Sequence, residues 1–393
     1  MTDRELSAEQ KQFFVNPYPV YEMARNARAI WDEEFGFWRV TRFSDIDSIL
    51  KDHRFGKIAP PGTEHLGPPE RLDRFERGIL SLDPPDHTRI RSLMVKAFSA
   101  KRVEMMRPII QALVDTLIDG VYDRGEMEIK TEFAHPIPAT IISDMLGIPD
   151  ADRSRFAELS NDIIRYGNDV LEADQSKADA AVGEFHSYLD TLIALKRKNP
   201  ADDLTTALIQ AQDEIGRLND EELQHNVSLL FIAGHETTVN LICNAIVALH
   251  RHPEQLAALR QDSSLMPRAV EEFLRYDSSV QQLPRVVQED LELDGQTLRA
   301  GQMVILMLGS ANHDPDVYEE AQTLDVQRPF IRAKSFGGGA HFCLGAQLAR
   351  IETEVALNTL LTRLPNLRIQ NLDELAYPPN PFFRGPEALN ANW

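Results

Sequence analysis

The chain has 393 residues, of which 26% are charged and 43% hydrophobic, which is typical of a globular protein with a large core. Its 61 acidic and 41 basic residues give a formal net charge of −20, which disfavours binding to nucleic acid or to an anionic membrane. It has neither a run of about 18 apolar residues, as a membrane span needs, nor an apolar signal core in its polar start, so we expect a cytoplasmic protein.

Helical periodicity dominates the first half of the chain. Residues 35–43 alternate and are rich in aromatic side chains, which predicts a strand. Helices are predicted over 44–51, 86–98, 103–119, 152–164, 174–196 and 202–212. Residues 57–77 are rich in proline and glycine and predict an irregular, mobile loop of the kind that borders binding sites. No repeat or linker appears, so we expect one domain over residues 1–393.

The longest predicted helix runs from about Asn219 to His252, with Asn219 or Asp220 as its cap and Pro253 after its end. At ~1.5 Å per residue it spans roughly 50 Å. Its middle is apolar on nearly every face, which predicts burial all round. A helix over 267–276, short strands within 286–295 and 303–309, and a last helix from near Cys343 to about residue 363 complete a mainly α protein with a minor β part.

The two cysteines lie in different surroundings, so a disulfide is not expected. Cys243 fits a buried cysteine of the apolar helix. Cys343 follows three glycines and precedes a helical pattern, so its sulfur should lie at a helix N-terminus, where N–H groups and the dipole lower the pKa of a thiol. A thiolate in a turn with almost no side chains suits a large flat cofactor. A buried core cysteine, or a nucleophile with His341 as its base, stays open at this point.

Three further patterns carry chemistry. In the middle of the long helix, the run Ala-Gly-His-Glu-Thr-Thr (233–238) conflicts with helix preference, as functional sites often do; a core helix bent by threonine is the alternative. Glu272 and Arg275 are three apart and can pair, as surface residues also do. A Pro-Pro pair opens a helix that places His87 and Arg91 on one face.

The segment around Cys343 resembles the haem-binding signature of the cytochrome P450 family, Phe-x-x-Gly-x-x-x-Cys-x-Gly, which is met by Phe336, Gly339, Cys343 and Gly345. The chain is similar to soluble bacterial members over nearly its whole length. The resemblance implies the cytochrome P450 fold, with haem b (iron protoporphyrin IX) between the long central helix and the cysteine-bearing helix. It implies that Cys343 ligates the iron, because an axial thiolate favours O–O cleavage.

The resemblance also implies roles for the other patterns. The long helix would open at residues 233–238 to admit dioxygen, with Ala233 and Gly234 at the cofactor, Thr237 and Glu236 as catalytic proton carriers, and His235 pointing away. Glu272 and Arg275, joined by Arg328, would hold the cysteine loop. Residues expected to bind the cofactor, mainly its carboxylates, are His87, Arg91, Arg285, His341, Phe336 and Gly345. Arg89 lies on another helix face and should be solvated.

These features predict a monooxygenase that oxidises a small, mainly hydrophobic organic molecule. We expect a monomer that receives its electrons from a separate iron–sulfur ferredoxin, which a ferredoxin reductase reduces. The ferredoxin would dock on a basic patch around Cys343. This patch would consist of Arg332, Lys334, Arg350, Arg89 and Lys96. Candidate pocket residues are Leu80, Leu229, Ile232, Ala233, Gln282, Leu283 and Phe382. The rivals are a peroxide-driven or radical-coupling haem-thiolate enzyme and a non-catalytic haem sensor.

Overall fold

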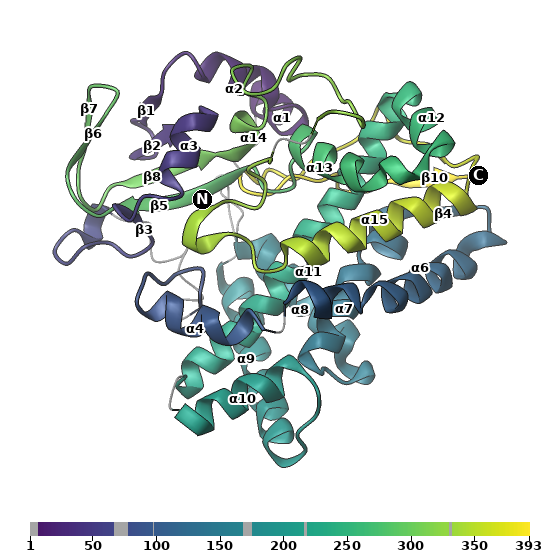
Figure 1. Ribbon diagram of the computed structural model, residues 1–393, viewed down its shortest axis with the longest axis horizontal. Helices are drawn as coiled ribbons and strands as arrows, with labels where there is room; N and C mark the ends of the chain where they lie inside the picture. Colours follow the sequence, from purple (N-terminus) through teal and green to yellow (C-terminus); the bar gives the residue numbers. More distant parts are fainter. Residues whose placement is uncertain (1–6, 67–77, 97, 168–174, 216–217, 330–331) are drawn as a thin grey trace.

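The computed structural model describes residues 7–66, 78–96, 98–167, 175–215, 218–329 and 332–393. Its helices gather around a long central helix, and a five-stranded sheet lies along one side of them (Figure 1). The predicted class, mainly α with a minor β part, is confirmed. The helices before the central one are α1 Ala8–Val15, α2 Tyr18–Ala24, α3 Phe43–Ile49, α4 Asp86–Met94, α5 Ala100–Glu104, α6 Arg107–Tyr122, α7 Pro136–Leu146, α8 Arg153–Gly167, α9 Gln175–Lys198 and α10 Leu204–Ile215.

The central helix, α11, spans Asp220–Arg251, as the sequence predicts. Asn219 caps it, in a reciprocal capping box with Glu222. Later helices are α12 Pro253–Gln261, α13 Met266–Tyr276, α14 Leu308–Ala311 and α15 Ala346–Arg363. Within the described residues, α11 alone is long and apolar enough to cross a membrane, but 78% of its apolar window is buried in the protein, as expected of a core helix.

The main sheet has the strand order β1-β2-β8-β5-β3, and only the β2–β8 pair is parallel. Its strands are β1 Ala29–Asp32, β2 Phe37–Val40, β3 Phe55–Gly56, β5 Gln282–Val287 and β8 Met303–Met307. A second sheet joins β4 Glu126–Glu128, β10 Asn390–Asn392 and β9 Arg368–Ile369, and β6 Leu291–Leu293 pairs with β7 Gln296–Leu298. The register of β3 on β5 places the chain after Gly56 next to Arg285.

Prolines explain two of the differences from the predicted elements. The helix expected over 103–119 is two helices, α5 and α6, because Pro108 starts a new helix within the first turn of α6. The sequence did not predict α7, since Pro136 and Pro138 lie at its start, where a helix tolerates proline. Of the loop expected over 57–77, residues 67–77 lie outside the described residues, and 57–66 are irregular apart from a short 3-10 turn over Glu64–Leu66.

Two apolar clusters meet along α11. The first half of α11, from Leu223 to Ile232, packs in one cluster with α8, α9 and α10. The second half, from Val239 to Leu249, packs in another cluster with α6, α13 and α15. Residues 233–238 belong to neither cluster. The gap in the core therefore coincides with the polar run of the helix.

Candidate active site

One face of α11 is open where the rest of the helix is buried. Ala233 is exposed, and Gly234, Glu236 and Thr237 are half-buried, although the residues on either side are buried. The helix is continuous through this segment, so the expected opening does not interrupt α11. The Thr237 hydroxyl donates a long hydrogen bond, 3.4 Å, to the Ala233 carbonyl oxygen one turn earlier.

The neighbours of Thr237 point in different directions. Gly234 faces α7, where an added Cβ would lie 3.1 Å from the Ile142 side chain, so the glycine permits close packing of the two helices. His235 is buried on the opposite side, with Nδ1 3.0 Å from the Phe231 carbonyl oxygen, and burial lowers its pKa. Its ring points away from the open face, as the resemblance implied.

The Glu236 carboxylate has two polar neighbours from other turns and elements. The Asn240 side-chain amide donates to its Oε1 at 3.3 Å, and Lys130 Nζ lies 3.9 Å from the same oxygen. Lys130 also donates to the Pro386 carbonyl oxygen at 3.0 Å, which fixes the lysine between α11 and the C-terminal segment. The sequence gives no signal for Lys130, since it lies far from Glu236 along the chain.

The loop before α15 is closed tightly on itself and on α3. The Cys343 N–H donates to the Phe336 carbonyl oxygen at 3.0 Å. Gly339 has φ +63°, and an added Cβ there would lie 1.8 Å from the Leu50 carbonyl oxygen, so only glycine fits. The Gly345 N–H forms a hydrogen bond to the Cys343 sulfur. Backbone contacts within the loop and with Leu50 thus fix the position of the sulfur.

The expected lowering of the Cys343 pKa is wrong for this structure. Cys343 as a residue is exposed, but protein atoms surround its thiol group. This burial of the thiol raises its pKa above the ordinary value. The Gly345 N–H and the charges of Arg91 and Arg350 oppose the rise without overcoming it. The helix begins only at Ala346, so few of its free N–H groups reach the sulfur. A bound metal ion would remove the thiol proton, whereas the thiol alone is a poor nucleophile.

His341 is unsuited to serve as a base for that thiol. Burial, reinforced by Lys57 and Arg285, lowers the pKa of His341 to about 2. An imidazole with so low a pKa has little affinity for a proton at neutral pH. The arrangement therefore disfavours the Cys–His nucleophile interpretation.

Buried hydrogen-bond donors gather on one side of the cysteine loop. The His87 and His341 rings lie 4.2 Å apart between centroids. His87 is 2% exposed, and neither of its ring nitrogens has a hydrogen-bond partner; His341 Nδ1 is also unpartnered. Buried Arg285 donates to the carbonyl oxygen of Pro284 at 2.9 Å, and Lys57 Nζ donates to the same oxygen at 3.1 Å. The sequence did not point to Lys57.

This set of donors fits the two carboxylates of haem b. Two cations and two imidazoles lie together here, with His87 and Arg285 buried and Lys57 and His341 half-buried. The nearby carboxylate of Asp83 already accepts the N–H groups of Lys57 and Ile58 through Oδ2. Buried polar groups normally have partners, so unpartnered donors here indicate that an acidic ligand completes the site.

Two arginines of α4 contact neighbouring elements. Arg91 donates to the Phe342 carbonyl oxygen at 2.6 Å, so it contacts the cysteine loop, and its positive charge helps to lower the pKa of both His87 and His341. Arg89 is not solvated: its guanidinium donates to Glu222 at 2.6 Å and to Asp86 at 2.8 Å. Arg89 therefore ties α4 to the start of α11.

Glu272, Arg275 and Arg328 form a buried ionic cluster. Arg275 donates twice to the Glu272 carboxylate, each time at 2.7 Å, and Arg328 Nε lies 3.1 Å from both carboxylate oxygens. Arg275 also donates to the Asn312 carbonyl oxygen at 3.0 Å. The Asn312 side chain accepts the Lys334 N–H at 2.7 Å, so the cluster connects to the start of the cysteine loop.

The predicted pocket residues divide between two sides of the sheet. Adjacent residues of a strand point to opposite faces, and Gln282 lies on the face that packs on Tyr21, with which its side chain interacts. Its prediction as a pocket residue is therefore wrong. Leu283 lies on the face of Arg285, and an added Cβ on Gly337 would lie 3.2 Å from it.

The other predicted pocket residues lie on α11, beside its first half and next to the start of β5. Leu229 and Ile232 are buried in the half of α11 before Ala233. Leu80 is 45% exposed and follows Ile79, whose N–H donates to the Asn226 side chain of α11 at 3.0 Å. Phe382 is half-buried, and its carbonyl oxygen accepts the Gln281 N–H at 2.8 Å.

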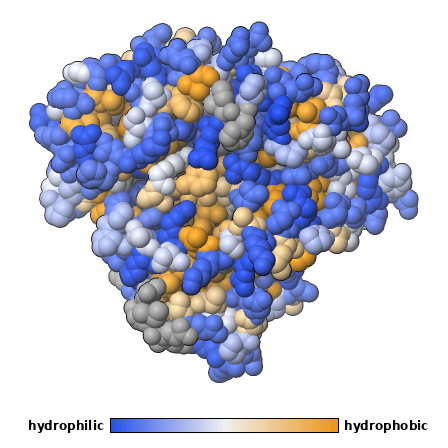
Figure 2. Space-filling model, in the orientation of Figure 1, coloured by the Kyte–Doolittle hydropathy of each residue, from blue (hydrophilic) through white to orange (hydrophobic). Residues whose placement is uncertain are grey.

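A cavity of about 630 Å³ lies on the outer side of Cys343. It is bordered by α4, α13 and α15, and Figure 2 shows apolar side chains gathered in the middle of this face. Its lining is partly apolar and partly charged: Arg91, Val95, Phe98, Pro267, Val270, Glu271, Arg332, Phe342, Cys343, Leu344, Ala346, Gln347, Arg350, Ile351 and Glu354.

The predicted basic patch is smaller than expected. Arg332 and Lys96 are exposed. Lys334 is buried, forms an ion pair with Asp47 and lies 4.3 Å from the centre of the Phe43 ring, so it cannot face a partner. Arg350 is on the rim of the cavity but pairs with Glu271.

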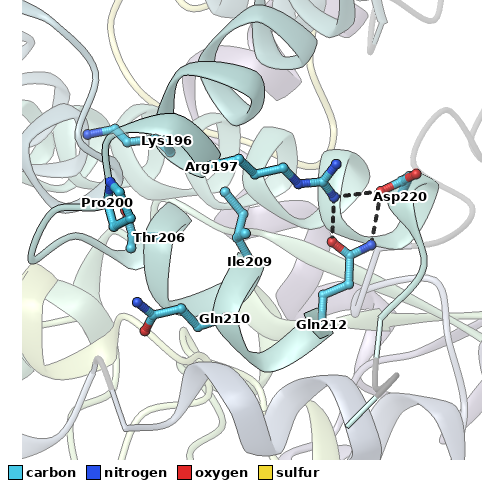
Figure 3. A pocket seen from close by; sticks show the side chains of 8 residues that line it. All are labelled: Lys196, Arg197, Pro200, Thr206, Ile209, Gln210, Gln212 and Asp220. Carbon is cyan, nitrogen blue, oxygen red and sulfur yellow. Dashed lines mark hydrogen bonds and ion pairs between the residues drawn. The ribbon is translucent and has the colours of Figure 1, made fainter. Parts of the chain in front are cut away.

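A second cavity, of about 450 Å³, lies between the end of α9, α10 and the start of α11 (Figure 3). Arg197 and Gln212 both point toward Asp220 and bond to it at 2.9 Å. None of the predicted site residues lines this cavity, and Arg197, Gln212 and Asp220 satisfy one another.

The comparisons with known proteins agree with this geometry. A family model described as Cytochrome P450 matches residues 40–371. The cytochrome P450 monooxygenase PikC of Streptomyces venezuelae is 37% identical over 99% of this chain and 94% of its own length. The vitamin D(3) 25-hydroxylase of Pseudonocardia autotrophica is 39% identical over 95% of this chain and 93% of its own. The solved structure of CYP109E1 from Bacillus megaterium with testosterone has a TM-score of 0.89 at 34% identity, covering 98% of this chain and 99% of that one.

Proposed function

Because this chain belongs to the cytochrome P450 family and is a monooxygenase that uses haem b, we propose that it inserts one atom of dioxygen into a small, mainly hydrophobic organic molecule. Cys343 serves as the iron ligand, and electrons arrive from a separate iron–sulfur ferredoxin and its reductase. The protein acts as a cytoplasmic monomer with one domain.

One observation carries this proposal. The unpartnered ring nitrogens of His87 and His341, together with the Arg285 guanidinium, lie on one side of a cysteine loop that backbone packing brings tightly against Leu50. A flat cofactor with two carboxylates at its edge and a metal at its centre matches both features. When bound, a haem held by the Cys343 thiolate would supply the chemistry that activates dioxygen.

The residues of α11 manage protons on the other side of the cofactor. The Thr237 hydroxyl holds only a 3.4 Å bond inside its helix, so it can turn to donate to a ligand or water at the open face. Glu236 lies between Lys130 and Asn240 and is positioned to pass a proton from that side of the helix toward Thr237. The apolar neighbours of the open face, Leu229 and Ile232, limit the entry of bulk water.

Apolar lining favours a hydrophobic substrate. Leu229 and Ile232 contribute hydrocarbon on α11 just before Ala233, and Leu283 contributes it beside Gly337 of the cysteine loop. Gln282, the one polar side chain among the candidates, faces Tyr21 instead. Two relatives whose names specify a ligand, a vitamin D(3) hydroxylase and a testosterone-bound enzyme, act on or bind hydrophobic molecules.

The ferredoxin would dock at the cavity outside Cys343. Arg332 is exposed there and its guanidinium lies 5.9 Å from the centre of the Phe342 ring, next to the cysteine. On a chain of net charge −20, such an exposed cation steers an acidic partner. Arg332→Glu should weaken ferredoxin-supported turnover and its salt dependence, whereas Lys11→Glu on α1 should change neither. Equal behaviour of the two variants would contradict this docking site.

The function is tested by isotope labelling. The purified protein should give a thiolate-type Soret band when reduced under carbon monoxide, and Cys343→Ser should lose that band. With ferredoxin, reductase and NADH under ¹⁸O₂, a substrate that shifts the iron to high spin should gain one labelled oxygen. Oxidation only with added peroxide, or binding without any oxidation, would favour the peroxide-driven enzyme or the sensor instead.

A further inference from the structure

Lys57 is a half-buried cation that none of the sequence motifs contains. It follows β3, and the register of β3 on β5 brings its backbone beside Arg285. Its N–H donates to Asp83 Oδ2 at 2.8 Å, which fixes the backbone, and its side chain reaches Pro284 on β5. Burial, reinforced by repulsion from Arg285, lowers the pKa of Lys57 well below the ordinary value.

Lys57 and Arg285 donate to one and the same carbonyl oxygen, that of Pro284, at 3.1 Å and 2.9 Å. A neutral oxygen cannot compensate two positive charges, and buried charges normally require a partner of opposite sign. Among the described residues no carboxylate lies within 4.0 Å of Lys57 Nζ, and the nearby acid, Asp83, is occupied by backbone N–H groups.

We propose that Lys57 is a cofactor-binding residue, whose ammonium group forms an ion pair with a haem carboxylate in the cluster of Arg285, His87 and His341. The roles of the two cations differ. The guanidinium of Arg285 offers a planar fork, whereas the ammonium is a compact charge that neutralises the remaining carboxylate charge. The inference rests on the haem b of the proposed function, and it adds a cofactor-binding residue that lies outside the family's signature around Cys343.

The charge of Lys57 should also act on the iron. A cation near the cofactor favours the reduced form, which carries one positive charge fewer. Removing that charge should therefore shift the midpoint potential of the holoenzyme to a more negative value. A lysine that only supported the loop would leave this potential unchanged when replaced by a side chain of similar length.

The test compares the holoenzyme with Lys57→Met and Lys57→Arg. We measure the transfer of haem to excess apomyoglobin from the Soret absorbance, and the midpoint potential by anaerobic titration. Lys57→Met should release haem about tenfold faster, the loss expected for a charge-assisted hydrogen bond, and should have a more negative potential. Lys57→Arg should keep the potential of the wild type.

The matched control is Lys51→Met, which removes an exposed lysine paired with Asp47 on the same side of the protein. It should match the wild type in both measurements. The inference would be overturned if Lys57→Met released haem at the same rate as the control and had the same midpoint potential. It would also be overturned if Lys57→Met released haem faster but kept the midpoint potential of the wild type. These outcomes leave the thiolate spectrum and the labelled product intact, so they are distinct from a failure of the proposed function.

Discussion

Replacing Arg275 with lysine tests whether a guanidinium fork, beyond a charge, holds the cysteine loop. Arg275 is 1% exposed and all five of its N–H donors are used, two on Glu272 and three on backbone carbonyl oxygens of residues 312, 321 and 323. Lysine keeps the charge but has three donors, so at least two of these five buried hydrogen bonds are lost. At about 1–2 kcal/mol for each, the folded state should lose about 2–4 kcal/mol.

The loss is measured as a shift in the melting temperature of the holoenzyme. For a chain of 393 residues, the unfolding entropy is about 0.8 kcal/mol/K, so Arg275→Lys should melt about 3–5 °C lower. The control is Arg268→Lys on the same helix, which is exposed and loses one bond to the Gln327 carbonyl oxygen. If both variants melt within about 1 °C of the wild type, the guanidinium fork does not stabilise the loop.

Three further predictions concern the loop, the proton carriers and pH. Gly339→Ala should prevent haem incorporation, because the added Cβ would collide with the Leu50 carbonyl oxygen. The control Gly120→Ala, whose added Cβ has open space around it, should incorporate haem normally, as measured from the Soret absorbance. Thr237→Ala should keep consuming dioxygen and NADH but form product about tenfold less efficiently or worse, measured as product per dioxygen. Burial lowers the pKa of His313 to about 4, so between pH 6.5 and pH 4 only the unfolded chain takes up the proton. The free energy of unfolding should therefore fall by up to about 3 kcal/mol as the pH falls through this range. Denaturant melts of His313→Gln over this range should depend less on pH.

The sequence predicts the fold best where the signal is local. The length and ends of α11 follow from an Asn cap, a long apolar run and Pro253, all read within one segment. Prolines hide α7, because the same residue that breaks a helix interior is tolerated in the first turn. Where a helix starts depends on the packing that it meets, which a single segment does not contain.

The candidate site divides in the same way. Cys343, Thr237 and Glu272 stand in short patterns whose members are neighbours in sequence, so the chain alone points to them. Lys57 and Lys130 act on residues more than a hundred positions away, through strand register and through contacts between distant segments. Lys334 is basic and next to the loop, yet its ion pair with Asp47 turns it inward. Only the folded chain distinguishes a surface cation from a buried one.

Side chains along β5 alternate between the two faces of the sheet, and this alternation limits which mutations the enzyme can accept. Leu283 and Arg285 face the cofactor side, while Gln282 faces Tyr21 on the other side of the sheet. Exchanging one side chain alters a single contact, but gaining or losing one residue here would send the arginine away from the carboxylates and bring its neighbours inward. Variation in substrate preference should therefore accumulate along this strand by substitution, at constant length.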